Sequence, residues 1–279
     1  MFMASFSFTS MSALVKVLGP DIPAVQIVFL RCLLALPLLF IVVRRNSGHL
    51  LVRDRGLIFL RTIFGLIAMV GFFYSIARMP LADAVFIGRS EPLFLTILAP
   101  LVVKERAPRS VWIALITGTV GLALIFKPAL DWHFAALVAS GAAFSSALAH
   151  LHVRKLNRSE TPLVIVFNFT LFTALFTSLF TLPSFVKLTG REWLILGGIA
   201  LLATIGQVLM TTAYQKDIAP VVASSSYISV LLSLLYGYLF WGEIPHPLTW
   251  VGGTTIVMGG LILLKDRFKA HEPPTPLAH

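Results

Sequence analysis

Apolar and polar positions follow one another in blocks along the chain. Runs of about twenty apolar residues are separated by short clusters of charged residues, Pro and Gly. A bilayer core about 30 Å thick needs roughly 17 to 25 mostly apolar residues per helix. Dividing the chain at the clusters predicts ten transmembrane helices over about residues 1–18, 22–43, 56–78, 81–103, 109–126, 132–154, 162–183, 192–214, 219–241 and 247–264. The polar, Pro-rich tail over 266–279 is expected to be disordered.

Composition supports an all-α integral membrane protein. The 279 residues are 57% hydrophobic and 12% charged, with a mean hydropathy of +0.90, whereas about 25% of residues are charged in a soluble domain. The net charge of +10 would suggest nucleic-acid binding in a soluble chain. Here the bases lie in short loops between apolar runs, so the expected partner is the lipid bilayer and not a nucleic acid.

The distribution of these bases predicts the orientation, because basic residues in short loops stay on the cytoplasmic side. Alternate loops hold fourteen Lys and Arg: residues 44, 45, 53, 55, 104, 106, 109, 154, 155, 158, 216, 265, 267 and 269. The opposite loops hold four: Arg78, Lys127, Lys187 and Arg191. Both termini are therefore expected in the cytoplasm of a multi-pass protein of the cytoplasmic membrane.

An internal repeat divides the chain into two halves. One offset of 138 residues relates four pairs: Glu105 and Glu243, Trp112 and Trp250, Gly121 and Gly259, Lys127 and Lys265. The boundaries fall at residues 1–127 and 131–265, with five helices in each half. Two copies of an odd-numbered unit enter the membrane in opposite directions, which predicts an inverted repeat with the substrate site between the halves.

The predicted helix 81–103 carries charges inside its apolar run. Asp83 and Glu91 lie eight residues apart, on one helical face with Ile87 and Phe94, whereas Arg89 is expected to point elsewhere. A charge at the centre of a bilayer costs about 2.5 to 3.5 kcal/mol on insertion scales, so such residues usually face a cavity or a partner. They are candidates for substrate binding or coupling, and the alternative is that they neutralise each other.

The same helix contains a weak point. Pro92 removes the helical hydrogen bond to the carbonyl of Gly88. The interval between these two residues brackets Arg89 and Glu91. We expect Gly88 and Pro92 to act as a hinge during a change of access.

Two further arginines lie within predicted helices. Arg31 falls in the middle of its helix and needs an internal partner, for which Glu91 and Asp83 are the available acids. Arg61 lies about one turn from a helix end, so its side chain is expected to extend to the membrane surface.

Hydroxyl and aromatic side chains form a second group of candidates. The helix 219–241 carries Ser226, Ser229, Ser233 and Tyr236 at helical spacing, with Tyr227 beside them, and this stripe can either bind substrate or let helices pack closely. Other polar or aromatic candidates within predicted helices are Ser5, Thr9, Ser12, Phe73, Tyr74, His150, Asn168, Gln207 and Tyr214. Each of these also fits a packing role.

Motifs for other chemistry are absent from the sequence. It has no H-E-x-x-H, G-x-S-x-G or Walker motif. Its single cysteine, Cys32, excludes an internal disulfide, and there is no Cys/His cluster at metal-ligand spacing. We therefore predict neither an enzyme nor a cofactor or metal. Glu105 is expected to serve structure, by pairing with nearby bases or by capping the helix that follows it.

Several segments together resemble the EamA-type transporters of the drug/metabolite transporter superfamily. In the first half these are FLRCLLALPLL, FLRTIFG, FYSIARMPLADA, EPLF and KERAPRSVWIALITGTVGLALI; in the second half, the run from YQKDIAP through LFWGEIPHPLTWVGG to MGGLIL. The resemblance covers nearly the whole chain. It implies ten helices, a central cavity shared by both halves, and movement of small metabolites, most often outward.

The expected function is that of a secondary transporter working by alternating access. The substrate would be a small amino-acid-like or aromatic metabolite, moved by export, with protons as the candidate coupling ion because intramembrane acids are present. The alternative within transport is uptake of a vitamin-like or nucleoside-like compound. A membrane sensor or assembly protein without transport is a third alternative, and the sequence makes no prediction of oligomeric state.

Overall fold

The computed structural model describes residues 1–47, 49–79, 81–105, 107–125 and 134–242, together with 251, 254, 255 and 258. Within these residues every regular element is a helix and no strand occurs. The α-helices are α1 Phe2–Leu18, α2 Ala24–Asn46, α3 Arg55–Ile76, α4 Leu81–Gly88, α5 Glu91–Val102, α6 Arg109–Ile125, α7 Phe134–Leu156, α8 Pro162–Thr181, α9 Gly190–Lys216, α10 Ala219–Ser224 and α11 Ile228–Trp241. Short 3-10 turns, η1 Leu182–Ser184 and η2 Ser225–Tyr227, follow α8 and α10.

Two of the predicted helices are interrupted, which corrects the expectation of continuous helices over 81–103 and 219–241. The first divides into α4 and α5, with Pro92 in the opening turn of α5, where its missing N–H costs nothing. The second divides at η2. There the hydroxyls of Ser225 and Ser226 donate to the carbonyls of Val221 and Ala223, at 2.9 and 2.6 Å, and such bonds compete with the regular helix.

Other predicted elements agree with the structure to within a few residues at each end, as α1, α6 and α8 show. The predicted helix 247–264 falls mostly outside the described residues, and the tail over 266–279 lies entirely outside them. The second member of each pair in the internal repeat is also outside the described part of the chain.

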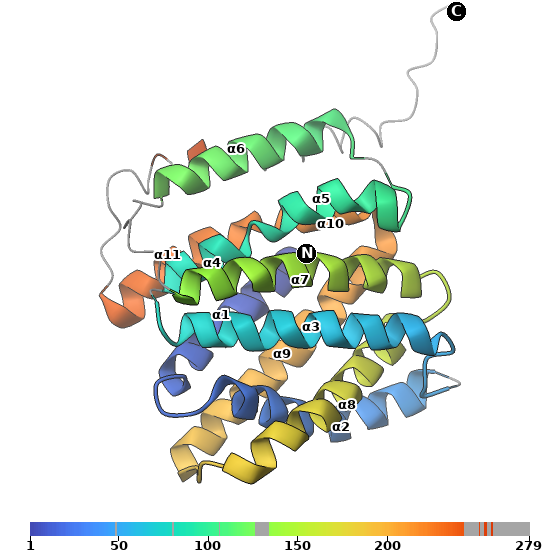
Figure 1. Cartoon of the computed structure of the whole chain (residues 1–279), viewed down its shortest axis with the longest axis vertical. Coiled ribbons are helices and arrows are strands. Elements are labelled where there is room, and N and C mark those ends of the chain that lie inside the picture. Colours follow the sequence, from blue (N-terminus) through green and yellow to red (C-terminus); the bar gives the residue numbers. More distant parts are fainter. Residues whose placement is uncertain are drawn as a thin grey trace, which may run out of the picture.

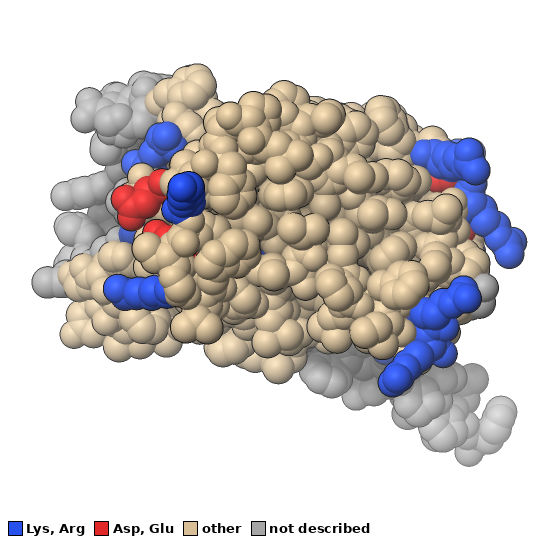
Figure 2. Space-filling model, turned by 90° about the horizontal axis from the view of Figure 1, so that it is seen from below, with Lys and Arg blue, Asp and Glu red and all other residues tan. Residues whose placement is uncertain are grey.

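Many described helices are long and apolar enough to cross a membrane. Six meet both criteria: Ala24–Asn46, Arg55–Ile76, Phe134–Leu156, Pro162–Ser184, Gly190–Lys216 and Val221–Trp241. Large apolar side chains lie on the outside, among them Leu101 and Leu194, 78% and 80% exposed. Figure 2 shows Lys, Arg, Asp and Glu at the two ends of the molecule, with a broad uncharged belt between them. This surface suits the lipid interior.

Helices from the two halves of the chain lie against each other in pairs. α3 packs along α7, α2 along α8 and α1 along α9, while α4 contacts α11 and α5 contacts α10 (Figure 1). Each pair therefore joins a helix before residue 125 to one after residue 134. The centre of the molecule is consequently an interface between the halves.

Glu105 ties several helix ends together. Lys104 has a left-handed backbone (φ 60°), so the chain turns sharply after α5. The Glu105 carboxylate accepts from Arg154 Nε at 2.7 Å and from the backbone N–H of Ala219 at 3.0 Å. The structural role is as predicted, but the partners come from α7 and α10 instead of the neighbouring bases or the following helix.

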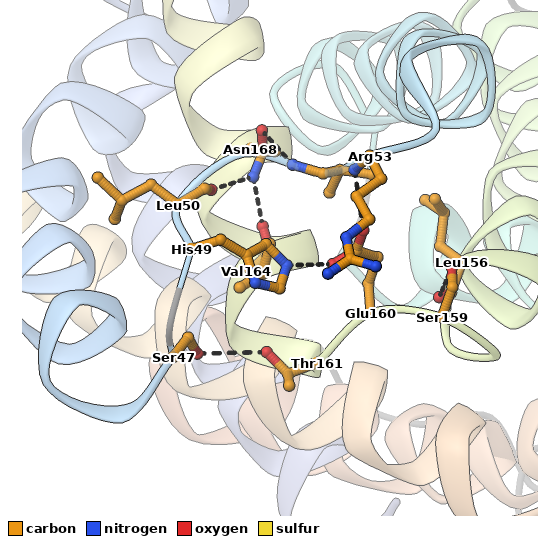
Figure 3. Close-up of polar contacts among 11 residues, drawn as sticks. Ser47, His49, Leu50, Arg53, Leu156, Ser159, Glu160, Thr161, Val164 and Asn168 are labelled. Atoms are coloured by element: carbon orange, nitrogen blue, oxygen red, sulfur yellow. Dashed lines mark hydrogen bonds and ion pairs between the residues drawn. The ribbon is translucent and has the colours of Figure 1, made fainter.

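A second carboxylate, Glu160, holds the loop between α2 and α3 (Figure 3). It is 4% exposed. His49 Nε2 lies 2.6 Å from one carboxylate oxygen, and the backbone N–H of Arg53 donates to the other at 2.8 Å. Asn168 supports the same loop, because its side-chain amide donates to the carbonyl of Leu50 at 2.7 Å. Asn168 thus serves structure here.

Replacing Glu105 with Ala should destabilise the protein strongly, because it leaves the Arg154 guanidinium without its carboxylate and the start of α10 without an acceptor. Breaking such a pair in a largely buried setting costs about 3 kcal/mol. The melting temperature of the purified protein measures this. Glu192, which is exposed and bonds only to Thr189, provides the control, and Glu192→Ala should change the melting temperature far less. Equal effects of the two changes would contradict this role for Glu105.

Candidate functional site

A cavity of about 160 Å³ lies at the interface between the two halves. Helices α1, α2, α3, α5, α7, α8 and α9 line it, together with the end of α4 and η2. Its polar lining consists of Ser5, Thr9, Ser12, Arg31, Arg61, Arg89, Glu91, Ser146, His150, Gln207 and Ser226. The remaining lining is mostly apolar and includes Met69, Phe72, Phe73, Phe169 and Met210. Charged groups and aromatic rings therefore face the same cavity.

Glu91 occupies the wall of this cavity at the start of α5. His150 Nδ1, from α7, lies 2.6 Å from its Oε1, and the hydroxyl of Ser146, one turn earlier on α7, donates to its Oε2 at 2.9 Å. The side chains of Glu91 and His150 are only 11% and 12% exposed. A carboxylate is also favoured at a helix N-terminus, where the helix dipole is positive. The histidine, the serine and the helix end thus each favour the Glu91 carboxylate, and together they offset the cost of burying its charge.

Arg89 lines the same cavity, which corrects the prediction that it would point away from Glu91. That prediction assumed one continuous helix. Because the chain turns at Arg89 and Ser90, the helical register is lost between the two charges. Arg89 follows the C-terminal end of α4, where the helix dipole is negative and favours a cation. Gly88 lines the cavity beside it, and an added Cβ there would lie 3.1 Å from the ring of Phe72.

Arg31 is buried, with 4% of its surface exposed. Of its two expected partners, Glu91 bonds His150 and Ser146 and forms no ion pair with Arg31, whose Nε has no hydrogen-bond partner among the described residues. The side chain of Asp83, the other predicted partner, lies outside the described residues. Arg31 therefore faces the cavity without a described counter-ion.

Arg61 is also inside the cavity, 3% exposed. The prediction that it would extend to the membrane surface is wrong. Its guanidinium lies over the ring of Phe169, 4.0 Å from the centroid, and donates to the side-chain oxygen of Gln207 at 3.4 Å. Gly65, one turn along α3, leaves the necessary space, since an added Cβ would collide with the Arg61 guanidinium and approach Phe169 at 2.8 Å.

Tyr214 backs the Glu91 and His150 pair from α9. Its ring is fully buried and stacks on the His150 ring, with centroids 5.1 Å apart. His152 points elsewhere, bonding to the carbonyl of Leu148 and stacking on Phe64. Tyr227 is buried against Gly118 of α6, where an added Cβ would lie 2.8 Å from its ring. Both tyrosines thus support the walls of the cavity.

Several predicted candidates are not part of this cavity. Ser229 and Ser233 are fully buried and donate to backbone carbonyls three residues earlier, those of Ser226 in η2 and Val230 in α11. Tyr236 bonds to Ser10, and Tyr74 packs against Phe134 and beneath Arg78. Of the serine stripe only Ser226 lines the cavity, because η2 changes the helical register after it.

Some cavity residues could not be predicted from the sequence. Ser146 and Phe169 belong to residue types that are abundant in the apolar runs, so their composition carries no signal. Arg61 was visible as an intramembrane charge, and only its direction was mistaken. Within the described residues, no group of three His, Cys, Asp or Glu is placed to hold a metal ion.

Thiol labelling can test whether this cavity is accessible and positively charged. Cys32 is buried, so Ala68→Cys in a Cys32→Ala background introduces one reactive position on the cavity wall. We expect an anionic methanethiosulfonate to react with it faster than a cationic one, because three arginines face one carboxylate there. The measurement is the labelling rate of purified protein.

The matched control is Ala147→Cys on α7, which is fully buried and outside the cavity. It should remain unlabelled. Equal labelling at both positions, or faster reaction of the cationic reagent at position 68, would contradict the described cavity.

Comparison with known proteins relates the chain to membrane carriers. The sequence model of the EamA-like transporter family matches residues 1–127 and again residues 133–265. The chain is 32% identical to the pseudopaline exporter CntI of Pseudomonas aeruginosa, over 95% of this chain and 94% of that protein. It is 29% identical to a riboflavin transporter of Vibrio cholerae, over 71% and 68% of the two chains.

A third relative is an S-adenosylmethionine uptake transporter of Rickettsia bellii, 25% identical over 91% of this chain and 88% of that protein. A crystal structure of another protein has a similar fold, with a TM-score of 0.78 at 17% identity and 97% of each chain covered. At that identity the similarity concerns the fold alone.

Proposed function

The chain belongs to the EamA-like transporter family, and on this premise we propose that it is a secondary transporter exporting a small amino-acid-like or aromatic metabolite by alternating access. It is a multi-pass protein of the bacterial cytoplasmic membrane. The observation that carries the proposal is the cavity between the two halves, where Arg31, Arg61, Arg89, Glu91 and His150 are enclosed together. Membership of a transporter family places the chain outside the enzymes in the main sense.

An inverted repeat of two five-helix units, over 1–127 and 131–265, is the architecture we propose. The family model matches twice, at nearly these boundaries. The two helix interruptions lie at nearly the same offset as the sequence repeat of 138 residues. The ends of α4 and α10, Gly88 and Ser224, are 136 residues apart, and the starts of α5 and α11, Glu91 and Ile228, are 137 apart. Exchanging the halves also maps the α3–α7 pair onto the α1–α9 pair, and the α4–α11 pair onto the α5–α10 pair. These correspondences support two-fold pseudo-symmetry.

We further propose ten membrane helices with both termini in the cytoplasm. The support is the distribution of Lys and Arg in the loops, fourteen on one side against four on the other. In this orientation the Glu105 and Glu160 contacts lie at the cytoplasmic end. Helix ends joined there would close one side of the cavity, as alternating access requires of one state.

The interrupted helices are the expected moving parts. Transporters often bind substrates and coupling ions where membrane helices are discontinuous near the middle of the bilayer. Gly88 and Pro92 bracket such a point, beside the cavity. A change in the angle between α4 and α5 would move Arg89 and Glu91 relative to His150. The opening of the cavity to one side of the membrane would thereby be coupled to the contacts that Glu91 makes.

Glu91 is the proposed coupling residue, with protons as the coupling ion. Its carboxylate lies at the cavity wall, 2.6 Å from Nδ1 of His150. Charged or titratable groups near Glu91 on several elements are His150, Arg89, Arg61 and Tyr214. Binding a proton would weaken the attraction between Glu91 and these cations, and so favour a rearrangement of α5 against α7.

The size of the cavity favours a small substrate. A volume of about 160 Å³ is close to that of an engineered cavity that binds benzene, about 150 Å³. An amino-acid-like group or a single ring fits this space. Uptake of a vitamin-like or nucleoside-like compound is the second candidate, favoured by the riboflavin and S-adenosylmethionine transporters among the relatives, and it would require the cavity to widen.

Metabolite comparison tests the export proposal. Cells with and without the protein are compared by untargeted mass spectrometry of cytoplasm and medium. We expect one or a few small amino-acid-like or aromatic compounds to accumulate in the medium of the expressing cells, and to cross reconstituted vesicles with saturable kinetics. Accumulation of a compound inside the expressing cells would favour uptake, and no flux of any compound would favour a sensor or assembly protein.

Replacing Glu91 with Gln tests its role in coupling. Gln keeps the shape and the contact with Ser146 but has no charge to exchange with a proton. In vesicles, transport by the normal protein should respond to an imposed pH gradient, whereas transport by Glu91→Gln should not. Glu192→Gln, at the exposed start of α9, is the control and should respond normally. A normal response by Glu91→Gln, at equal protein levels, would remove Glu91 from the mechanism.

A further inference from the structure

We propose that Arg31 and Arg61, with Gln207, form a subsite for a carboxylate group of the transported molecule. This inference rests on the transport function proposed above and specifies its substrate class. Arg31 comes from α2, Arg61 from α3 and Gln207 from α9. All three side chains line the central cavity, and Arg61 bonds directly to Gln207.

Both arginines are almost completely buried, with 4% and 3% of their surface exposed. Among the described residues, neither forms an ion pair, and the Nε group of each has no hydrogen-bond partner. Glu91 is near Arg61 but is not in contact with it. Ion pairs among the described residues join Glu91 to His150, Glu105 to Arg154 and Glu160 to His49. None of these carboxylates lies within 4.0 Å of either guanidinium. Two buried cations thus lack the acidic partner that a buried charge usually requires.

The two guanidinium groups also lie close enough to repel each other. Arg31 and Gln207 further share a small adjoining pocket of about 10 Å³, lined by Cys32 and Thr170 among others, which shows that the two side chains are neighbours. The positions of Arg31 and Arg61 are therefore linked through Gln207. Two like charges held together in this way form a focus of positive potential inside the protein.

Arg61 is held in place by groups that leave most of its donors free. Phe169 covers one face of its guanidinium, and Gly65 provides the space for this contact. Gln207 takes one N–H at 3.4 Å, a long bond. A guanidinium carries five N–H donors in a fixed fork that matches a carboxylate. The contact with the Phe169 ring orients the guanidinium of Arg61 without using its N–H donors. Such an arrangement suits a group that must bind and release an anion.

A carboxylate of a bound molecule, placed between the two arginines, would relieve both the lack of hydrogen-bond acceptors and the repulsion between the like charges. It would supply acceptors for the unpaired N–H groups and would neutralise part of the repulsion. Glu91 does not fill this role in the structure, because its carboxylate bonds His150 and Ser146 and lies more than 4.0 Å from both guanidinium groups. The anion is therefore not one of the carboxylates described above. A molecule that crosses through this cavity is its natural source, so we infer that the substrate carries at least one carboxylate.

Selective loss of carboxylates from the transported set tests this subsite. Metabolites in cytoplasm and medium are compared for cells making the normal protein, Arg31→Gln, Arg61→Gln or Gly65→Ala, with Arg191→Gln as the control. Arg191 lies exposed in the first turn of α9, away from the cavity. We expect every compound that depends on the normal protein to carry a carboxylate. Its transport should fall about tenfold or more in Arg31→Gln and Arg61→Gln.

Gly65→Ala keeps both charges but displaces the Arg61 guanidinium, so it should reduce transport of the same compounds, while Arg191→Gln should not. Dependence on the normal protein of compounds that lack a carboxylate would overturn the inference. Unchanged carboxylate transport in both Arg31→Gln and Arg61→Gln would overturn it too. If no compound depends on the normal protein, the transport function itself fails, which is a different result. The chemistry of the compounds moved by the normal protein decides the question even if a variant does not fold.

The melting temperature provides a second test that needs no substrate. An unpaired buried charge destabilises the empty protein, so Arg31→Met, which removes the charge and keeps much of the volume, should raise the melting temperature of the purified protein. A lower melting temperature for Arg31→Met would show that Arg31 has an acidic or structural partner in the empty state, and would overturn its assignment to a substrate subsite.

Discussion

Charged side chains and interrupted helices inside a membrane protein must be shielded from lipid by other protein segments or by water. The central cavity of this protein meets this requirement. An unpaired backbone group or side-chain charge in the lipid interior costs several kcal/mol. The chain nevertheless breaks a helix between Gly88 and Glu91 and places Arg89 and Glu91 at the break. Helices from the other half of the chain, above all α7 and α11, surround this point. The packing of the two halves therefore keeps these charges away from lipid and lowers the free energy that placing them in the membrane would cost.

The helix break also arranges the charges. The end of α4 carries a partial negative charge and the start of α5 a partial positive one, so Arg89 and Glu91 each stand at the helix end that favours them. His150 and Ser146 then fix the carboxylate from α7. The groups of this site are hydrogen-bonded to one another, yet they belong to separate helices. A shift of one helix against another would change the contacts of Glu91 directly.

Arg31 and Arg61 differ from this pair because their charge is not balanced among the described residues. The contrast is clearest against the ends of the molecule, where Arg154 meets Glu105 and His49 meets Glu160. These charges at the ends of the molecule have partners within the chain. Arg31 and Arg61 have no such partner within 4.0 Å among the described residues, and this difference is the physical basis for assigning them to a substrate.

The sequence by itself determined the helical membrane class and most helix boundaries, and it singled out Glu91 as a candidate site residue. The lengths of the apolar runs and the presence of charges within them can be read locally, and both have large effects on the free energy of membrane insertion. It also marked the weak point at Gly88 and Pro92, since proline acts on its own backbone. Only the tertiary structure decided where the charges point. Arg61 turns inward because Gly65 and Phe169 make room for it, and Glu91 pairs with His150 rather than Arg31 because α7 packs beside α5. The direction of each of these side chains depends on residues far apart in the chain. Their proximity cannot be predicted from local sequence patterns.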